Sequence, residues 1–301
     1  MKIVYMGTPD FAVKPLEALV NSGYDVALVV SKADRAKDRG KKMQSCPVKL
    51  KAQELGIPVE TPEKIKGNEE FISKIKELNP DLIIVAAYGK ILPLDILNIP
   101  RLGCVNIHGS LLPKYRGAAP IQRAVIEGAE KTGITLMYMA EGMDTGDMIA
   151  KAETSVDHKT ADELFVELSA LGADLLVKYL PLIENGTAPR EKQNDEEATL
   201  APMVYKETID WTKSAHEIDC LIRGTDCQTV WNGQVMKVHM AEEAAGNGEP
   251  GTVIHVDKKT VEIACGNGSL KLKNIQMPGK KAMPIDAFLL GNKIEEGCKL
   301  G

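Results

Sequence analysis

The sequence predicts an α/β protein, in which a doubly wound, mostly parallel sheet is followed by a small β-barrel. Over the first part of the chain, short runs rich in Val and Ile recur between segments whose apolar residues have helical spacing. Buried strands that alternate with helices are typical of a parallel sheet. Later in the chain, short β-rich runs are separated by Gly, Asn and Asp turns, which favours a barrel. We therefore expect a Rossmann-like domain followed by an OB-like barrel.

The strands of the expected sheet are short and apolar. Four buried strands are predicted, at residues 2–6, 25–30, 81–86 and 104–107. Two more, at residues 132–139 and 148–152, lie on either side of a glycine-bounded turn. Between the first two strands, apolar residues at helical spacing predict a helix that ends at Asn21-Ser22-Gly23.

A long amphipathic helix is expected after the sheet. Thr160 and Glu163 form a capping box, in which each side chain satisfies a backbone N–H at the start of the helix. One apolar face then follows, made of Leu164, Phe165, Leu168, Leu171, Leu175 and Tyr179. From residue 185 to about residue 206 the chain is polar and contains Pro189 and Pro202, which indicates a linker or an extended crossing segment.

The last third of the chain has a different pattern. Ser214 and Glu217 form a second capping box that opens a short helix. Short strands are predicted at residues 234–239, 251–256, 260–264 and 269–272. These patterns predict a catalytic domain, a linker and a C-terminal barrel domain, at residues 1–188, 189–206 and 207–301.

Composition excludes several classes of protein. The 301 residues carry a formal net charge of −5, so any contact with nucleic acid must come from a local basic patch. The six cysteines form no Cys-x-x-Cys pair and the five histidines no His-Glu-x-x-His motif, so we expect free thiols and no metal. The N-terminus lacks the apolar region of a signal peptide, and no apolar run is long enough to cross a bilayer. We expect a cytoplasmic protein without membrane contact, and a monomer.

The first chemical feature is Asn106-Ile107-His108, at the end of an apolar strand and followed by Gly109. Ligands of open α/β sheets bind at the carboxyl ends of strands. Residues i and i+2 of a strand share a face, so Asn106 and His108 point the same way and could donate hydrogen bonds to a developing oxyanion. Taken alone, an Asn and a His at the end of a strand are more often polar groups that cap a loop.

Two loops complete the pattern. Residues 110–117 form a turn shaped by Pro113 and Gly117, whose apolar side chains could face a flat ligand or simply the core. Residues 142–147 form a glycine-bounded turn in which Asp144 could lie beside His108 and orient its ring. A turn of this composition is also common in ordinary hairpins.

The three features occur in order, in the pattern Asn106-x-His108-x-Ser110-Leu111-Leu112-Pro113-x-x-Arg116-Gly117 followed by Asp144-x-Gly146. This pattern resembles the folate-dependent formyltransferase superfamily. The resemblance implies that Asn106, His108 and Asp144 are catalytic and that the formyl donor is 10-formyltetrahydrofolate. It also implies a folate site lined by Ser110, Leu111, Leu112 and Pro113.

Other segments resemble the branch of this superfamily that formylates methionyl initiator tRNA. They lie at residues 7–13, 34–35, 39–42, 46–49, 209–211, 214–215, 222–224, 279–281 and 288–291. The resemblance implies transfer of the formyl group to the methionyl α-amino group. The chain departs from the family at residues 225–231, which lack the usual prolines and look shortened, so the first barrel strand is in doubt. Met6-Gly7-Thr8-Pro9 is not a Gly-x-Gly-x-x-Gly motif, which disfavours a nicotinamide cofactor.

A basic segment follows the second strand. Residues 32–51 contain eight basic and two acidic residues, a local charge of +6. The segment could be a solvated loop, or it could bind the phosphates of the tRNA acceptor arm. The resemblance points to Arg39, Lys41 and Lys42 as the tRNA contacts.

The expected mechanism is direct attack of the methionyl amine on the formyl carbon. Asn106 and a protonated His108 would stabilise the tetrahedral oxyanion, and Asp144 would favour the imidazolium and help to accept the proton of the amine. Two alternatives stay open. One is a folate-dependent formyltransferase that acts on a small amine, such as a nucleotide amine or an amino sugar, and the other is a catalytically idle RNA-binding protein.

Overall fold

The computed structural model describes residues 1–37 and 42–301, and the chain forms two compact units. The first unit comprises residues 1–120, 131–155 and 162–202. The second comprises residues 121–130, 156–161 and 203–301. Within the described residues, no helix combines the length and the apolar character that a membrane span requires.

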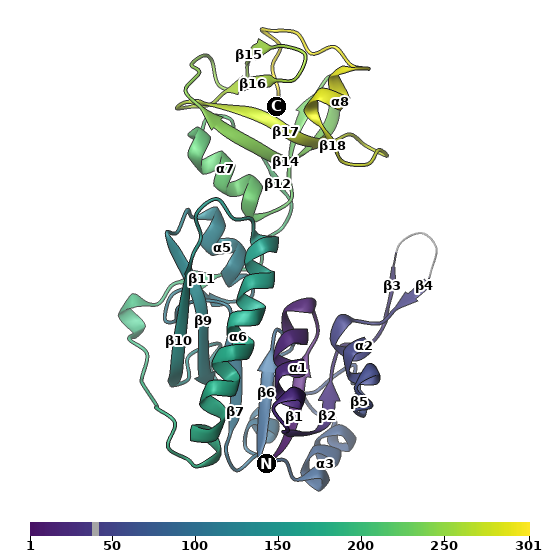
Figure 1. Ribbon diagram of the computed structural model, residues 1–301, viewed down its shortest axis with the longest axis vertical. Helices are drawn as coiled ribbons and strands as arrows, with labels where there is room; N and C mark the ends of the chain where they lie inside the picture. Colours follow the sequence, from purple (N-terminus) through teal and green to yellow (C-terminus); the bar gives the residue numbers. More distant parts are fainter. Residues whose placement is uncertain (38–41) are drawn as a thin grey trace. The chain divides into compact units, whose positions relative to one another are not determined.

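The first unit is built on a seven-stranded sheet (Figure 1). In spatial order its strands are β10 (Met148–Ser155), β9 (Lys131–Tyr138), β7 (Cys104–His108), β6 (Leu82–Ala86), β1 (Lys2–Gly7), β2 (Asp25–Val30) and β5 (Val59–Glu60). The strands from β7 to β5 are mutually parallel, whereas β9 is antiparallel to both β7 and β10. From β1 the chain first adds β2 and β5 on one side, and then β6 and β7 on the other side of β1. The predicted doubly wound, mostly parallel sheet is therefore confirmed.

Both faces of this sheet are covered, which explains why its strands are apolar without alternation. Val4 and Met6 of β1 pack in a core with residues of α3. On the opposite face, the Tyr5 hydroxyl donates to the Ala12 carbonyl in the turn before α1. The helices of the first part of the chain are α1 (Val13–Asn21), α2 (Pro47–Glu54), α3 (Glu69–Leu78), α4 (Leu94–Leu97) and α5 (Pro120–Ile126), and a 3-10 turn, η1, spans Asp10–Ala12.

The long helix α6 (Ala161–Glu184) forms where the apolar pattern predicts it. Ser169 donates to the Phe11 carbonyl, and the rings of Phe165 and Phe11 meet edge to face. Helix α6 approaches β7 closely at Gly172, where a Cβ atom would lie 2.9 Å from Ile107 Cγ2. The helix therefore packs against the strand that carries Asn106 and His108.

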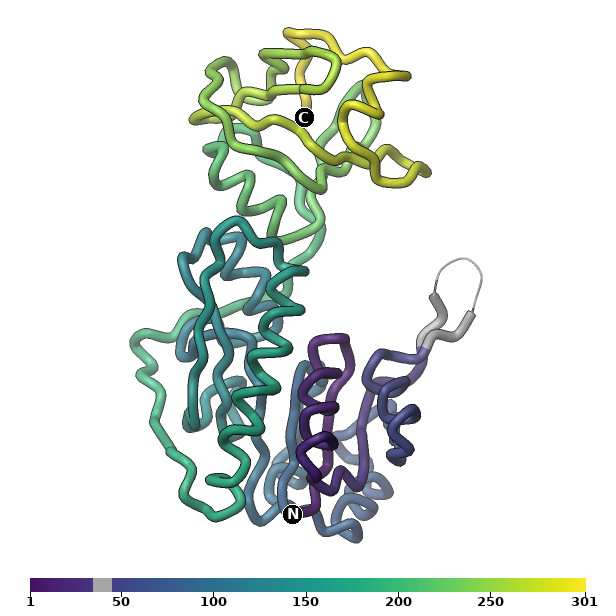
Figure 2. Tube along the Cα trace, viewed as in Figure 1, coloured from purple at the N-terminus to yellow at the C-terminus, as the bar shows by residue number. Residues whose placement is uncertain are grey.

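The polar segment after α6 runs back along the first unit (Figure 2). Its β11 (Leu200–Ala201) pairs in parallel with β8 (Arg116–Gly117), and Glu191 forms an isolated bridge with Met148. A 3-10 turn, η2 (Asp195–Glu197), lies between them. The segment is thus an extended crossing connection, hydrogen-bonded to the loops that follow β7 and β9.

The second unit contains a mainly antiparallel sheet in the order β12-β13-β14-β17-β16-β15, with β18 also paired to β17. Besides α5, its elements are β12 (Glu207–Thr208), α7 (Ala215–Gly224), β13 (Cys227–Trp231), β14 (Gln234–Ala244), β15 (Val253–Val256), β16 (Val261–Ala264), β17 (Ser269–Gln276), β18 (Met283–Pro284) and α8 (Ile285–Leu289). The capping box of Ser214 and Glu217 at the start of α7 is confirmed. Strand β13, in the segment that departs from the family pattern, pairs with β14 along its whole length.

The last residues of the chain close this sheet into a barrel. Gly301 N donates to the Val230 carbonyl on β13, while Leu300 N donates to the Gly251 carbonyl beside β15. The C-terminal segment therefore lies between the two edges of the sheet, over a core that includes Trp231 and Phe288. The predicted OB-like barrel is confirmed, with a closing segment that contains no regular strand.

The basic segment contains a short antiparallel pair, β3 (Arg35–Lys37) and β4 (Lys42–Gln44). The predicted tRNA contacts Arg39 and Lys41 lie outside the described residues, and Lys42 is described only as the first backbone position of β4.

Candidate active site

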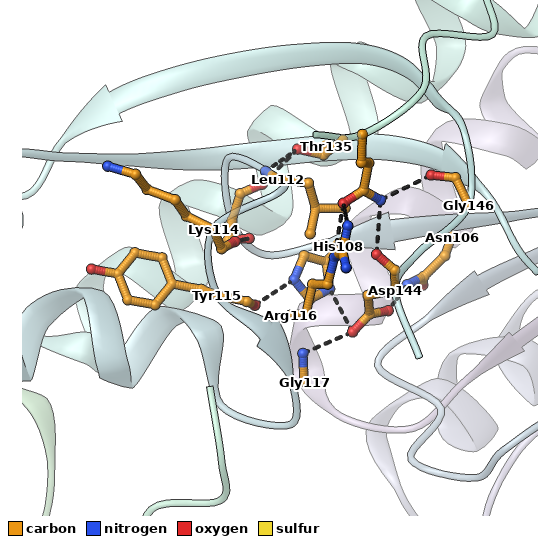
Figure 3. A network of polar contacts seen from close by, with 12 residues as sticks. Asn106, His108, Leu112, Lys114, Tyr115, Arg116, Gly117, Thr135, Asp144 and Gly146 are labelled. Atoms are coloured by element: carbon orange, nitrogen blue, oxygen red, sulfur yellow. Dashed lines mark hydrogen bonds and ion pairs between the residues drawn. The ribbon is translucent and has the colours of Figure 1, made fainter. Parts of the chain in front are cut away.

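Asn106, His108 and Asp144 lie together at the end of β7 (Figure 3). Asn106 and His108 are two residues apart on the strand, so their side chains share a face. Asp144 comes from the turn between β9 and β10, and β9 pairs directly with β7. Asp144 Oδ1 lies 3.4 Å from Asn106 Nδ2, and Asp144 Oδ2 lies 3.6 Å from His108 Nδ1.

The Asp144 carboxylate is held by the backbone of the neighbouring loop. Gly117 N donates to Asp144 Oδ2 at 2.9 Å. Gly117 has a φ of 129°, and a Cβ atom there would lie 2.7 Å from the Ala201 carbonyl oxygen. Glycine is therefore required at this position, because only glycine allows this backbone to approach both Asp144 and β11.

The turn that carries Asp144 is tightly folded. Asp144 itself has a φ of 54°, in the left-handed region that Asp and Asn tolerate better than most residues. Two positions later, a Cβ atom on Gly146 would lie 1.8 Å from the Tyr138 carbonyl oxygen. The Asp144-x-Gly146 spacing thus combines a left-handed turn residue with a position that has no room for a side chain.

His108 is almost fully buried, and both its ring nitrogens face oxygen acceptors. Nε2 lies 2.9 Å from the Tyr115 carbonyl oxygen, whereas Nδ1 faces the Asp144 carboxylate. An imidazolium with a proton on each nitrogen suits this arrangement. The contact to Tyr115 is a hydrogen bond, but the 3.6 Å separation from Asp144 exceeds hydrogen-bond length, so Nδ1 is the better placed of the two nitrogens to donate to a substrate oxygen.

The loop predicted to bind folate is held in shape by hydrogen bonds and by a buried side chain. Ser110 is buried, and its hydroxyl donates to the Lys114 carbonyl. Thr135 of β9 donates to the Ser110 carbonyl and accepts a hydrogen bond from Leu112 N. The Leu112 side chain is buried against Met137 and Met148. The side chains of Ser110 and Leu112 therefore shape the loop.

The other two members of the predicted folate site have a different environment. Leu111 and Pro113 are half-buried, and the Leu112–Pro113 peptide bond is cis. The side chains of Leu111 and Pro113 are thus the side chains of 110–113 that a bound molecule could reach.

Two residues of the site were not assigned a role from the sequence. Gln193, in the crossing segment, donates from Nε2 to the carbonyl oxygens of Asp144 at 2.8 Å and Gly146 at 2.9 Å. Arg116 belongs to the loop motif, and its guanidinium donates twice to Gln193 Oε1. A glutamine in a polar segment carries no periodic signal, so only the path of the chain reveals this contact.

The arrangement suits acyl transfer to an amine. An amide and an imidazolium can donate to an oxyanion, and the adjacent carboxylate can balance the imidazolium charge while a proton moves. Among residues 1–37 and 42–301, no group of three or more His, Cys, Asp or Glu side chains is placed to hold a metal ion.

Comparison with known proteins adds independent findings. Residues 1–180 match the family model of formyl transferases, and residues 204–293 match the model of the formyl transferase C-terminal domain. Methionyl-tRNA formyltransferase of Clostridioides difficile is 48% identical over 310 residues, which cover 100% of both chains. The protein with the same name from Acetivibrio thermocellus is 48% identical over 311 residues, again covering 100% of both chains.

Solved structures share the fold at lower identity. An N-formyltransferase from Helicobacter canadensis, in complex with folinic acid and dTDP-3-aminofucose, superposes with a TM-score of 0.70 at 20% identity, covering 92% of this chain and 99% of the other. HypX from Aquifex aeolicus, in complex with tetrahydrofolic acid, superposes with a TM-score of 0.66 at 16% identity, covering 99% of this chain and 50% of the other. At these identities the likeness concerns the fold alone.

Proposed function

The chain belongs to the formyl transferase family, and we propose that it transfers the formyl group of 10-formyltetrahydrofolate to the α-amino group of methionine on initiator tRNA. The observation that carries the acceptor assignment is the 48% identity, over the full length of both chains, to relatives named methionyl-tRNA formyltransferase. The convergence of Asn106, His108 and Asp144 supplies the chemistry that this reaction needs.

The reaction begins when the lone pair of the methionyl nitrogen attacks the formyl carbon. Asn106 Nδ2 and His108 Nδ1 donate to the oxygen that becomes negative, and together they form the oxyanion hole. The hydrogen bond from His108 Nε2 to the Tyr115 carbonyl holds the ring in place during this step. The new carbon–nitrogen bond then persists, and the bond from the formyl carbon to the folate nitrogen breaks.

One proton has to move for each turnover. The methionyl nitrogen loses a proton, and the departing folate nitrogen gains one. The Asp144 carboxylate lies beside His108 and is anchored by Gly117 N, so the pair can accept the first proton and return one to the leaving nitrogen. Every atom of the transfer is thus accounted for by the two substrates and this pair.

The donor fits the residues that flank the site. A folate has a flat, largely apolar ring with hydrogen-bonding edges, and the half-buried side chains of Leu111 and Pro113 offer apolar surface beside it. The buried Ser110 and Leu112 keep the loop in its shape. Ser110 to Pro113 thus serve as a preformed wall for the donor.

The tRNA is bound in part by the basic segment 32–51, whose charge of +6 contrasts with the net charge of −5 of the whole chain. Arg39, Lys41 and Lys42 of this segment contact the acceptor arm. Replacing Arg39 by Ala raises KM for the charged tRNA and leaves KM for the folate nearly unchanged. An unaltered KM for the tRNA would remove Arg39 from this role.

The decisive experiment offers the purified protein 10-formyltetrahydrofolate with four possible acceptors. These are methionyl initiator tRNA, uncharged initiator tRNA, free methionine and a nucleotide-linked amino sugar. We expect formylation of the charged tRNA alone. Preferred formylation of the amino sugar would instead establish a small-amine transferase, and tRNA binding without any transfer would establish an idle RNA-binding protein.

A further inference from the structure

We propose that Gln193 is a positioning residue that holds the Asp144 turn in the conformation needed for transfer, a role that rests on the proposed function. Gln193 lies 49 positions after Asp144 in the chain, in the crossing segment rather than in the catalytic motif. Its amide nitrogen donates to two carbonyl oxygens of the turn, those of Asp144 and Gly146. Gln193 thereby holds the backbone of the turn on both sides of residue 145.

Arg116 determines which way the Gln193 amide points. Its Nε lies 3.0 Å and its Nη2 2.8 Å from Gln193 Oε1, so both guanidinium donors meet the amide oxygen. Arginine has only donors, and therefore the amide oxygen must face it and the amide nitrogen must face the turn. Arg116 is itself buried, which limits the orientations open to the pair.

The turn needs such an anchor because most of its residues are exposed. Residues 141, 142, 143 and 145 are exposed, and the Met143 side chain is 60% exposed. Asp144 adopts a positive φ, a conformation that is uncommon for residues other than glycine. The carboxylate has its own anchor at Gly117 N, and the carbonyls of Asp144 and Gly146 are held by the two bonds from Gln193.

The same crossing segment also holds the loop that faces the turn. Thr199 accepts a hydrogen bond from Tyr115 N through its hydroxyl and one from Arg116 N through its carbonyl. Tyr115 supplies the carbonyl that orients His108. The crossing segment therefore contacts the loop that orients His108 and also the turn that carries Asp144. Gln193 makes the contact with the Asp144 turn.

Three variants test this role. Gln193→Ala removes all four hydrogen bonds of the amide. Gln193→Glu has nearly the same shape and keeps an acceptor for Arg116, but it places a carboxylate oxygen against the carbonyls of Asp144 and Gly146. The matched control is Asn194→Ala, since the Asn194 side chain bonds only locally, with Glu196 N and Glu197.

We expect both Gln193 variants to lower kcat by about 10- to 100-fold, because small displacements of a catalytic group are costly. KM for the charged tRNA and for the folate should change little, since the Gln193 amide already spends its hydrogen bonds on Arg116 and on the carbonyls of Asp144 and Gly146. Asn194→Ala should keep the kcat of the wild-type protein. Thermal unfolding of each variant establishes that the protein is folded at the assay temperature.

A double-mutant cycle with Asp144→Asn separates positioning from general support of the fold. If Gln193 acts through Asp144, then Gln193→Ala lowers kcat no further once the carboxylate is gone. Multiplying losses in the double variant would overturn the inference, as would a wild-type kcat for Gln193→Glu. A wild-type protein that fails to formylate methionyl initiator tRNA would instead overturn the proposed function, so the two failures are distinguishable.

Discussion

The charge of Asp144 provides the sharpest test of the proposed chemistry. Asp144→Asn keeps the shape of the side chain and an oxygen that can accept from Gly117 N. Asn also tolerates the φ of 54° at this position, so the turn should retain its conformation. The substitution removes the negative charge beside His108, and it also replaces the oxygen that accepts from Asn106 Nδ2 by an NH2 group.

The size of the effect follows from the geometry. Asp144 Oδ2 lies 3.6 Å from His108 Nδ1, and the Asp144 side chain is 15% exposed. At this separation, Coulomb's law with an effective dielectric constant of about 20 gives about 4 to 5 kcal/mol between a carboxylate and an imidazolium. Only the part of this energy that is gained in the transition state affects kcat, and about 1.4 kcal/mol changes a rate tenfold, so the variant should lose at most about 10³-fold in kcat.

The assay is formyl transfer to methionyl initiator tRNA under single-turnover conditions, which isolate the chemical step. Asp147→Asn is the matched control, because it removes the same charge from the same turn and leaves Asp144 unchanged. The Asp147 variant should transfer at the wild-type rate. If Asp144→Asn also stayed within about tenfold of the wild-type rate, the charge pair would not be part of the mechanism.

Four further outcomes are expected. Asn106→Ala should lower kcat by about 10²- to 10³-fold through loss of an oxyanion donor, measured in the same transfer assay. Gly146→Ala should lower both kcat and the free energy of unfolding, the latter by about 1–3 kcal/mol in chemical denaturation, since its Cβ would meet the Tyr138 carbonyl at 1.8 Å. Ser214→Ala should cost about 1 kcal/mol of unfolding free energy through loss of the capping box. Burial raises the pKa of Cys104 to about 12, so its thiolate is scarce at pH 8, and mass spectrometry should find it alkylated only after unfolding.

The placement of Asn106 and His108 on one face of a strand was predictable because its signal is local. Asn106 and His108 are separated by one residue on an apolar strand, and the pleat of a strand alone places them on one face. The buried strands were equally readable, since a sheet covered on both faces requires runs of apolar residues. Hydrophobic periodicity is a property of neighbouring residues, and a sequence displays it directly.

The resemblance to the formyltransferases predicted that Asp144 belongs to the same site. It did not predict how the Asp144 carboxylate is positioned there. The pairing of β9 with β7 brings the Asp144 turn to the end of the strand, and the hydrogen bond from Gly117 N aims the carboxylate. Similarly, Ser110 and Leu112 belong to the motif, yet only the structure shows that their side chains face inward. A motif states which residues are present, while burial depends on what the rest of the chain packs around them.

Composition and periodicity determined the fold class, with the barrel after the sheet, and the strand that carries Asn106 and His108. The tertiary structure decided what lies far apart in the chain: Gln193 against the Asp144 turn, and the C-terminal residues between β13 and β15. Such contacts are hydrogen bonds of polar or irregular segments, whose partners are set by the path of the backbone. They leave no repeating pattern of apolar residues, and therefore no trace in the sequence alone.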